Sequence, residues 1–422
     1  MEKLVLAEFK FELPDTAMAV LQEIAGLAQE SGFQRLALVG GAVRDGLRHQ
    51  FGQCTDASLE IPDLDLVVEG SAIALAQMLS ERLEQDRLTH MQIHQAFDTV
   101  GLVVDGVRLD LATARQESYP IAAENPQVSA GSLETDLARR DFTVNAMAVE
   151  LAEARLLDLH AGCDALKSRQ LFLLHPKSVE DDPTRIIRAA RYAARLEFEL
   201  APATLDQIRR TLLSWPWSWC LDQAPELAPP ALASRLGMEL NLLMQHEPWF
   251  KALTNLQRWG ALSLLDDQLQ ADHLWPCRLR WAAHLGIPRI LALVLGAASP
   301  LAVAARLQLS HQQQGMLKES LVLQQFLAGS DVAEGWPDWT PARWCEALEQ
   351  MCWRPEAVAL TICTGVPMWH KLFRWFYRWR HVCPQQSAQQ LMAEGWRPGP
   401  DLGAELRRQR LEQVNLLEDK SG

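Results

Sequence analysis

The chain lacks the features of a secreted, zinc-binding or membrane-spanning protein. Its eight cysteines include no Cys-x-x-Cys pair and no zinc-like histidine spacing, so we expect reduced thiols, no disulfide and no structural metal. The start of the sequence lacks the basic end and the cleavage site of a signal peptide, and the longest apolar run, residues 290–305, is broken by Ser299-Pro300. The sequence therefore predicts a cytoplasmic protein without a membrane span.

Positive charge is also in short supply. The 422 residues carry 40 Lys and Arg against 53 Asp and Glu, a formal net charge of −13. That balance excludes a protein that holds nucleic acid over its whole surface, but a local basic groove remains compatible with an acidic exterior. Since 48% of the residues are hydrophobic, the chain is globular, and its length favours about two to four domains.

A strand, a glycine turn and a helix start follow one another early in the chain. An apolar run over residues 36–39 meets Gly40-Gly41, and Arg44 stands one turn inside the helix that follows. Glycines let the backbone approach a ligand, and the amino end of a helix favours anions. The pattern predicts a phosphate cradle, although Gly-Gly before a helix is also common in Rossmann-like turns.

A second strand follows soon after and carries two acids. Residues 64–68 are apolar except for Asp65, and strand alternation places Asp63 and Asp65 on the same face. Two parallel carboxylates repel each other unless a cation lies between them, and such hard oxygen ligands suit Mg²⁺ completed by waters and substrate phosphates. Asp-x-Asp alone occurs on many surfaces. After the glycine turn, it indicates nucleotidyl transfer with a metal–nucleotide substrate.

Two further stretches add candidate site residues. Asp110 lies on a later strand and could supply a third carboxylate, which would orient a metal ion or accept the proton of an attacking hydroxyl. The alternative is an acid at a strand edge without a role in catalysis. Arg139 or Arg140 offers a planar fork to a triphosphate, while Asp141 accepts from a ribose hydroxyl or fixes the arginine. A surface salt-bridge cluster is the alternative interpretation of Arg-Arg-Asp.

A helix is expected to begin at Asp182-Pro183, because these residues suit the N-cap and the first helical position. Arg185, Arg188 and Arg191 then recur every three residues as a cationic stripe, which we interpret as facing a ligand rather than solvent. Asp182 and Arg185 together present acceptors and a donor fork, enough to read the Watson–Crick edge of a base without a template.

The order of elements predicts an α+β protein. Strand and helix patterns alternate up to about residue 150, which indicates a domain with a mixed β-sheet, and helical patterns then predict an all-α remainder. We expect strands near residues 36–39, 64–68, 99–104 and 108–112, and helices over residues 17–31, 72–84, 182–196, 202–213, 230–244 and 341–352.

The motifs, taken together in this order, resemble the class II tRNA nucleotidyltransferase and bacterial poly(A) polymerase family, over about residues 35 to 265. The matching stretches are Gly-Gly-Ala-Val-Arg-Asp, Asp-x-Asp, Asp-Leu-Ala-Thr-Ala-Arg-x-Glu-x-Tyr, Arg-Arg-Asp-Phe-Thr-Val-Asn-Ala-Met-Ala and Asp-Asp-Pro-Thr-Arg-Ile-Ile-Arg-Ala-Ala-Arg. The resemblance implies attack by the 3′ hydroxyl of tRNA on the α-phosphate of CTP or ATP, with pyrophosphate leaving.

The resemblance also implies a division of the chain and roles for its residues. A nucleotidyltransferase head spans residues 1–150, a base-recognising neck 151–215, a helical body 216–340 and a helical tail, expected to contact tRNA, 341–422. By matching position, the family assigns Mg²⁺ binding to Asp63 and Asp65, nucleotide contact to Gly41, Arg44 and Arg140, and the wall of the nucleotide pocket to Asp182, Arg185, Arg188 and Arg191.

Members of this family differ in product, and the sequence leaves the choice open. CCA addition and repair is the leading hypothesis; the alternatives are a CC-adding enzyme, an A-adding enzyme, a poly(A) polymerase and, more remotely, an inactive RNA-binding module. Asp181 stands where the family usually has Glu, and Asp98 stands in a loop that usually reads Phe-Gly-Thr and is implicated in switching between C and A. The segment 48–62 is longer than usual, and no His-Asp phosphohydrolase signature follows the body.

Residues 368–381, in the expected tail, interleave aromatic and basic side chains. Such a segment can stack on unpaired bases and pair with phosphates. Because helical spacing alone also creates an aromatic stripe, we favour a core-facing stripe with a basic outer face. That outer face remains a candidate contact for tRNA.

Overall fold

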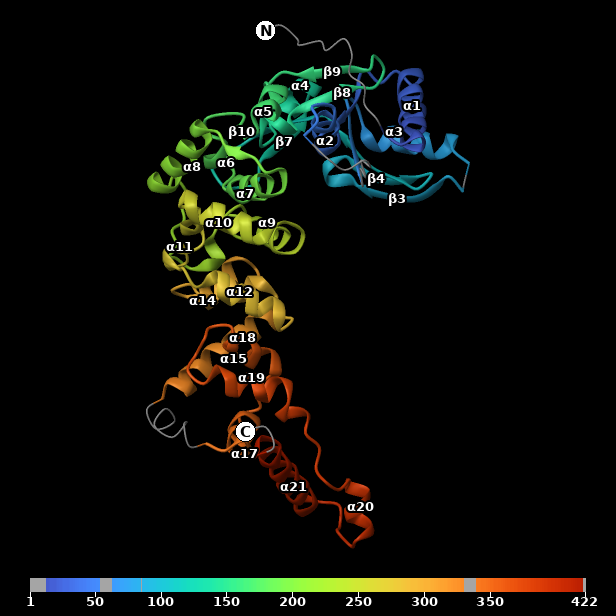
Figure 1. Cartoon of the computed structure of the whole chain (residues 1–422). Coiled ribbons are helices and arrows are strands. Elements are labelled where there is room, and N and C mark those ends of the chain that lie inside the picture. Colours follow the sequence, from blue (N-terminus) through green and yellow to red (C-terminus); the bar gives the residue numbers. More distant parts are fainter. Residues whose placement is uncertain (1–12, 54–62, 85, 330–338, 420–422) are drawn as a thin grey trace. The chain divides into compact units, whose positions relative to one another are not determined.

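The computed structural model of the protein describes residues 13–53, 63–84, 86–329 and 339–419 (Figure 1). The chain divides into two compact units. Unit 1 comprises residues 1–218, 229–239 and 245–261, and unit 2 comprises residues 219–228, 240–244 and 262–422. The candidate site residues named above all belong to unit 1.

Unit 1 is built on a seven-stranded sheet with the order β3-β4-β5-β2-β1-β8-β9. The β2–β5 pair is parallel and the other neighbouring pairs are antiparallel, so the sheet is mixed, as the sequence predicts. The strands are β1 (Leu36–Val39), β2 (Leu64–Val68), β3 (Leu88–His94), β4 (Thr99–Val104), β5 (Val107–Thr113), β8 (Met147–Glu150) and β9 (Arg155–Asp158). A separate ribbon pairs β6 (Arg115–Ser118) with β7 (Gln127–Ala130).

Three strands of the large sheet have no counterpart among the predicted ones. β3 is an edge strand whose side chains are mostly exposed, so its sequence lacks a hydrophobic side. Residues 133–148, which contain the Arg-Arg-Asp stretch, form α4 (Leu133–Ala138), a 3-10 turn and the start of β8. The helix ends early because the chain enters the sheet, where the apolar residues of β8 are buried.

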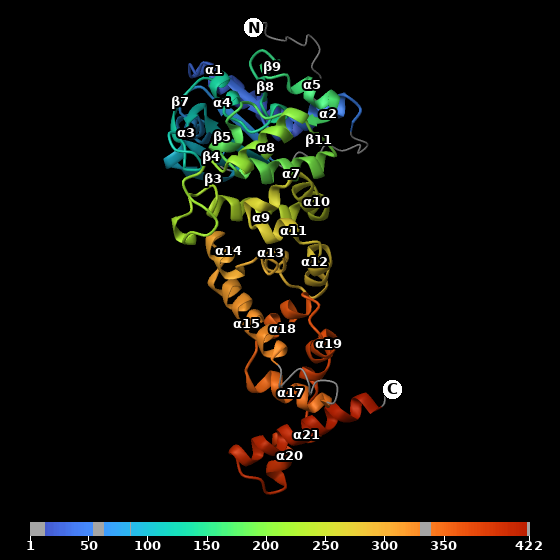
Figure 2. The same cartoon turned by 90° about the vertical axis from the view of Figure 1, so that its left-hand side faces the viewer.

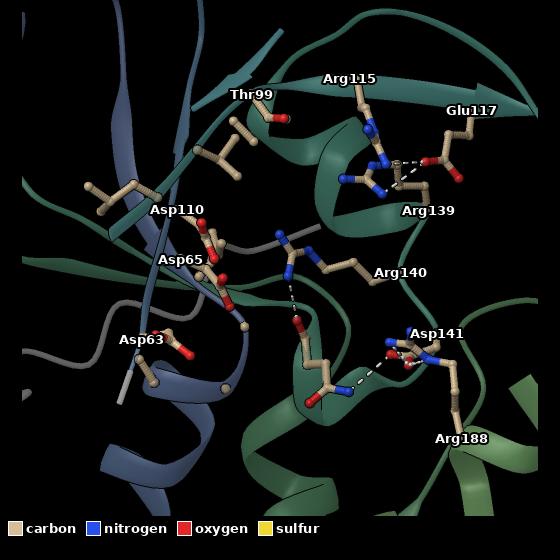
Figure 3. Close-up of a pocket in the computed structure, with 18 of the residues that line it drawn as sticks. Asp63, Asp65, Thr99, Asp110, Arg115, Glu117, Arg139, Arg140, Asp141 and Arg188 are labelled. Atoms are coloured by element: carbon tan, nitrogen blue, oxygen red, sulfur yellow. Dashed lines mark hydrogen bonds and ion pairs between the residues drawn. The ribbon is translucent and has the colours of Figure 1, made fainter. Parts of the chain in front are cut away.

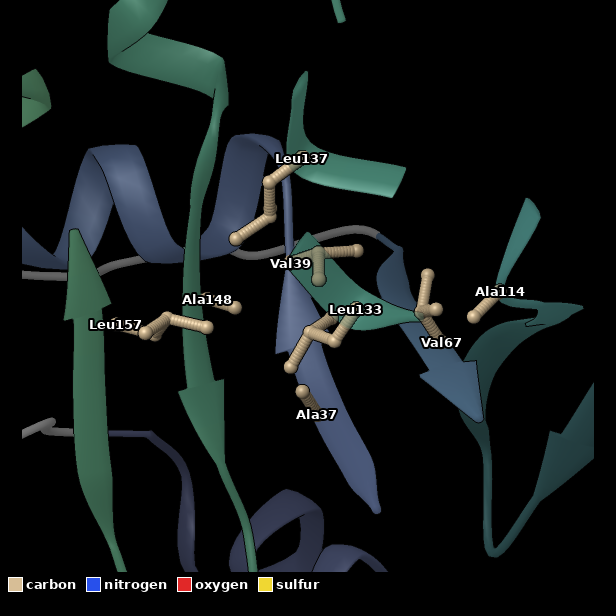
Figure 4. Packing of buried hydrophobic residues seen from close by; sticks show 8 residues of the cluster. All are labelled: Ala37, Val39, Val67, Ala114, Leu133, Leu137, Ala148 and Leu157. Carbon is tan, nitrogen blue, oxygen red and sulfur yellow. The ribbon is translucent and has the colours of Figure 1, made fainter. Parts of the chain in front are cut away.

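A small hydrophobic cluster joins α4 to one face of the sheet (Figure 4). Leu133 and Leu137 of α4 pack with residues of β1, β2, β8 and β9, and the alanines of that face leave room for the helix to approach. This packing fixes the position of the residues that directly follow α4. The cluster contains Ala37, Val39, Val67, Ala114, Leu133, Leu137, Ala148 and Leu157.

Helices surround the sheet and continue the unit. The predicted helices at 17–31, 72–84, 182–196 and 202–213 are all found, with shifted ends. A two-residue parallel ladder joins β10 (Gln170–Leu171), which precedes α7 in the chain, to β11 (Glu199–Leu200), which follows it. The helices that carry residues of unit 1 are α1 (Asp15–Glu30), α2 (Gly41–Gln50), α3 (Ala72–Arg82), α4, α5 (Gly162–Ser168), α6 (Ser178–Asp181), α7 (Thr184–Leu196), α8 (Pro202–Ser214), α9 (Ser234–His246), which also carries residues of unit 2, and α10 (Trp249–Trp259).

Helices are the regular secondary structure of the described part of unit 2, and turns and loops connect them (Figure 2). In the part of the chain that the structure describes, none of the helices combines the length and the apolar character that a membrane span needs. The helices of unit 2 are α11 (Asp267–Ala271), α12 (Trp275–His284), α13 (Arg289–Val294), α14 (Pro300–Arg306), α15 (His311–Ala328), α17 (Pro341–Gln350), α18 (Pro355–Ile362), α19 (Trp369–Tyr377), α20 (Ala388–Ala393) and α21 (Pro400–Asp419).

The aromatic segment 368–381 forms α19 and a 3-10 turn. Trp375 and Trp379 are buried, which confirms the preference for a core-facing stripe. Trp369 and Tyr377 remain partly exposed and pack with Phe373 and with aromatic side chains of α12. Most of the stripe therefore serves the packing of unit 2.

We predict that the core around β2 controls the stability of unit 1. Leu66 is 1% exposed, so Leu66→Ala is expected to lower the free energy of unfolding by about 2–5 kcal/mol, through lost burial and the cavity left behind. Leu213 of α8 is 87% exposed and serves as the matched control, with an expected change within about 0.5 kcal/mol for Leu213→Ala. Equilibrium urea unfolding compares the two variants, and equal effects would contradict the assignment of Leu66 to the core.

Candidate active site

Three carboxylates lie together on the sheet. The parallel pairing of β2 and β5 makes Asp65 and Asp110 register partners, so their side chains share one face. Asp63 precedes β2 and lies close to them (Figure 3). Because β5 runs between β4 and β2, Asp110 is not on an edge strand of the described sheet. The alternative interpretation of Asp110 as a strand-edge acid therefore does not describe its position.

The carboxylates of Asp65 and Asp110 lie in an environment that opposes their ionisation. Burial raises the pKa of Asp65, and the nearby Asp110 and Asp63 raise it further, against the attraction of Arg140 and Arg44. Burial likewise raises the pKa of Asp110, with Asp63 as the next cause. Among the described residues, neither carboxylate accepts a hydrogen bond or forms an ion pair. A bound cation would relieve this repulsion.

The glycine turn lies against one side of the cluster formed by Asp63, Asp65 and Asp110. Gly40 precedes the first residue of α2 with φ of 70°, in the region that favours glycine. A Cβ there would also lie 2.9 Å from Asp65 Oδ2 and 3.4 Å from Arg140 Nη1. Glycine therefore brings the amino end of α2 against the carboxylates, which is the arrangement expected of a phosphate cradle.

The donor set fits Mg²⁺ better than a metal that needs a full protein cage. Within the described residues, no group of three or more His, Cys, Asp or Glu side chains could hold a metal ion by itself. Mg²⁺ commonly uses one or two carboxylates and completes its shell with waters and substrate phosphates. Asp63 and Asp65, beside a helix amino end, offer such a partial shell.

Two arginines that follow α4 line the cavity that contains these carboxylates. Asp136 of α4 is fully buried and accepts from Arg139, at 2.7 and 3.0 Å, and from Arg140 Nη2, at 3.0 Å. Arg139 also donates to Glu117, at 3.0 Å. Arg140 lies over the glycine turn and contacts the carbonyl of Asn145 at 3.4 Å (Figure 3). The buried Asp136 shows that Arg-Arg-Asp begins an interior network rather than a surface salt-bridge cluster.

A second chain of contacts links α2 to α7. Arg44, 5% exposed, donates to Asn145 Oδ1 at 2.8 Å and to its neighbour Asp45 at 2.7 and 3.0 Å. Asn145 donates to Asp141 at 3.0 Å, and Arg188 donates to the other oxygen of Asp141 at 2.7 Å. Of the two roles considered for Asp141, fixing an arginine is the one that its contacts match.

The neck residues do not all face the same way. Asp182 and Arg185 line the cavity that also contains the carboxylates, as does Arg188. Arg191 instead pairs with Glu239 and lies 3.2 Å from Glu247. Arg191 therefore leaves the expected ligand-facing stripe, because Glu239 of α9 and Glu247, the residue that follows α9, neutralise it. Arg195, one turn further along α7, lines the cavity again.

The cavity measures about 960 Å³, enough for a nucleoside triphosphate, and lies within unit 1. It brings together Gly40, Gly41, Arg44, Asp63, Asp65, Asp110, Arg140, Asp182, Arg185 and Arg188. Sequence reasoning missed Tyr192 and Arg235, which also line it. Tyr192 follows Arg188 by one helical turn, which was an available signal, whereas Arg235 lies on α9, too far along the chain for a local pattern to reveal.

The loop before β4 departs from the family pattern at Asp98. This residue adopts a left-handed conformation with φ of 46°, and its side chain accepts from Ile73 N at 3.0 Å, Thr113 Oγ1 at 2.7 Å and Ser71 Oγ at 3.1 Å. The loop is thus attached to the start of α3 and to β5. Most of the long segment 48–62 lies outside the described residues.

Comparison with known proteins agrees with this arrangement. Residues 36–172 match the family described as the poly A polymerase head domain. The CC-adding tRNA nucleotidyltransferase of Deinococcus radiodurans is 38% identical over 240 residues, or 54% of this chain and 55% of that protein. The A-adding tRNA nucleotidyltransferase of Aquifex aeolicus is 38% identical over 239 residues, or 56% of this chain and 26% of that protein.

Solved structures extend the likeness beyond the head. A CCA-adding enzyme in its apo form II has a TM-score of 0.72 at 21% identity, covering 96% of this chain and 93% of that one. The CCA-adding enzyme of Thermotoga maritima complexed with tRNA has a TM-score of 0.68 at 20% identity, covering 96% of this chain and 92% of that one. Residues 36–172 thus resemble the poly A polymerase head domain, in a chain that has the fold seen in solved CCA-adding enzymes.

Proposed function

We propose that this protein is a template-independent nucleotidyltransferase that adds CMP and AMP, from CTP and ATP, to the 3′ end of tRNA, and so builds and repairs the CCA end. The observation that carries the proposal is the single cavity in which Asp65 and Asp110 face the amino end of α2 and the neck residues Asp182 and Arg185. The names of the relatives support the substrate class.

We further propose that each segment of the chain has its own function. The head, residues 1–150, carries the chemistry; the neck, 151–215, recognises the base; the body, 216–340, and the tail, 341–422, hold tRNA in the cytoplasm. The basic outer face of the segment 368–381 is the candidate tRNA contact of the tail.

In this mechanism the carboxylates organise the reacting groups. Asp63 and Asp65 would hold Mg²⁺, which lowers the pKa of the attacking hydroxyl and neutralises charge on the leaving group. Asp110, with its raised pKa, is suited to take the proton of the tRNA 3′ hydroxyl. The 3′ oxygen then bonds to the α-phosphorus of the nucleotide, the bond from that phosphorus to the β-phosphate oxygen breaks, and pyrophosphate leaves.

The arginines hold the triphosphate during this step. Arg140 lies beside Asp65 and Gly40, where it would pair with phosphate oxygens, and Arg44 extends the same positive region at the start of α2. Both side chains are already held by buried partners, Asp136 and Asn145 respectively. Little side-chain entropy would then be lost when the nucleotide binds.

Split-function enzymes are the main alternative. The relatives include proteins named CC-adding and A-adding, both at 38% identity, and one named CCA-adding at 31% identity, so their names leave all three products as candidates. The chain spans 55% of the length of the first of these relatives and 26% of the second. The activity of the whole relative is therefore a proposal for this chain.

Three tRNA transcripts distinguish these products. One lacks the whole CCA end, one ends after the first C and one after the second C, and each is incubated with labelled CTP or ATP. We expect CMP on the first two and AMP on the third. Incorporation of CMP alone, or of AMP alone, identifies a split-function enzyme, and incorporation of neither contradicts nucleotidyl transfer.

Removing one metal-binding carboxylate should abolish the reaction. Asp65→Asn is expected to lower kcat by about a thousandfold or more, because a metal ion supplies several kcal/mol of transition-state stabilisation. Binding of tRNA, measured by filter retention, should remain. Asp206→Asn on α8, whose side chain is 60% exposed, is the matched control and should keep full activity. Unchanged turnover in Asp65→Asn would remove this residue from the metal site.

The raised pKa of Asp65 makes a separate prediction about stability. Without metal, the buried ionised carboxylate opposes folding, so Asp65→Asn is expected to be more stable than the wild type at neutral pH. This penalty disappears as the pH falls through the raised pKa, since the folded protein then binds the proton. The stability gap should therefore narrow toward acid pH in urea unfolding with a chelator. A gap that widens toward acid pH would contradict the assignment.

A further inference from the structure

One face of β3, β4 and β5 continues from the carboxylates to the edge of the sheet. Asp110 pairs in register with a residue of β4, and that residue pairs with one of β3. Because side chains alternate along a strand, register partners and their second neighbours share this face. We call it the β3–β5 face. Beside Asp110 it carries Gly101, Gln92, Arg108, Val103 and His90.

Side chains of the β3–β5 face reach solvent. His90, Gln92 and Arg108 are exposed, whereas the other face of these strands is buried where α1 and α3 contact β4 and β5. Exposure of one face is ordinary for antiparallel strands and assigns no role by itself. The position of this face beside Asp110, and its charge, are what distinguish it.

The proposed reaction needs two approaches to the carboxylates. In phosphoryl transfer the attacking and leaving oxygens lie roughly in line, on opposite sides of the phosphorus. The glycine turn at Gly40 follows β1, which pairs with β2 on one side of Asp65, and β5 with Asp110 lies on the other side. Pyrophosphate that leaves toward the glycine turn therefore requires a 3′ hydroxyl that arrives from the side of β5, over the β3–β5 face.

Gly101 keeps this approach open. It is the register partner of Asp110 on β4, and it lines the cavity together with Asp110 and His94. Among the described residues, a Cβ at Gly101 would meet only Asp110 Oδ1 within 4 Å, at 3.4 Å. The cavity thus continues onto the β3–β5 face at the carboxylate that is suited to take the proton of the hydroxyl.

Arg108 lies on this face two residues before Asp110. Its Nη1 lies 4.0 Å from Asp63 Oδ1, and the side chains of Arg108 and Asp63 are 70% and 52% exposed. An ion pair that is so long and so exposed contributes little to stability. A cation held by Asp63 would compete with Arg108 for the carboxylate, so the guanidinium becomes available to an anion when the metal binds.

The charge of the β3–β5 face suits an RNA strand. Apart from Asp110, the residues that define the face include no acid, although the chain as a whole carries a formal net charge of −13. Its donors are the guanidinium of Arg108, the amide of Gln92 and the imidazole of His90. Backbone phosphates supply acceptors to such donors, and the planar fork of arginine matches phosphate oxygens.

We propose that Arg108 binds a backbone phosphate near the 3′ end of tRNA, and that the β3–β5 face carries the unpaired strand whose terminal hydroxyl attacks. This inference rests on the proposed nucleotidyl transfer and deepens it. It makes Arg108 a residue that positions the RNA end, while nucleotide binding stays with the other side of the cavity.

The test measures binding of two tRNA transcripts to the full chain by filter retention, with Mg²⁺ present. One transcript ends after the second C, and the other lacks all of its unpaired 3′ nucleotides. Arg108→Ala is expected to weaken binding of the first about tenfold, the loss typical of a hydrogen bond to a charged group, and to leave binding of the second unchanged. Equal weakening of both transcripts, or of neither, overturns the proposal.

Two further readouts separate a phosphate contact from an effect on Asp63. For the longer transcript, the slope of log binding constant against log salt should fall by about 0.7 in Arg108→Ala and return in Arg108→Lys, which keeps the charge. At saturating tRNA, kcat and the KM for CTP should stay at their wild-type values. A lower kcat with unchanged tRNA binding, or a slope that Arg108→Lys does not restore, overturns the proposal.

Arg82→Ala is the matched control. Arg82 of α3 also forms an exposed ion pair, with Glu30, but it belongs to a helix that covers the other face of the sheet. This variant should bind both transcripts as the wild type does.

The wild-type protein separates the two levels of inference. If it binds neither transcript, or incorporates no nucleotide, the proposed function itself is contradicted. If it adds nucleotides while Arg108→Ala binds both transcripts as the wild type does, the proposed transfer survives and the role of Arg108 is overturned.

Discussion

The repulsion between Asp65 and Asp110 is the constraint around which unit 1 is arranged. Parallel pairing of β2 and β5 puts the two carboxylates side by side, and burial makes each harder to ionise. Folding alone gains nothing from this arrangement, since two uncharged residues would fit the same sheet at lower electrostatic cost. Such strain in the fold is expected where a cation and a phosphate group are to be bound.

The positive side of the cavity is built on the opposite principle. Two of its arginines are held by a carboxylate that is mostly or fully buried: Asp136 holds Arg140, and Asp141 holds Arg188. The attraction of Asp141 raises the pKa of Arg188 well above its usual value, although burial opposes this. These pairs fix the direction of each guanidinium before a ligand arrives. The cavity therefore combines two carboxylates that repel each other with guanidinium groups of fixed direction, and under the proposed function this is a preorganised electrostatic site for a cation and a phosphate group.

The predictable parts of this site are those encoded by neighbouring residues. Strand alternation located Asp63 and Asp65, the glycine turn located the start of α2, and Asp182-Pro183 located α7 within two residues. The partner of Arg191 could not be predicted, because Glu239 comes from another helix. The edge strand β3 was missed because exposed strands need no hydrophobic side, and β8 because a short apolar run fits a helix as well as a buried strand.

Asp98 fixes the loop before β4, in which the resemblance to the family implies a role in the choice of nucleotide. Glycine adopts the left-handed conformation at no steric cost but contributes no side-chain hydrogen bond, whereas Asp98 adopts it and binds both α3 and Thr113. The next residue, Thr99, lines the cavity. A wall attached in this way resists rearrangement, so it favours recognition by fixed donors and acceptors over a loop that adapts to each base.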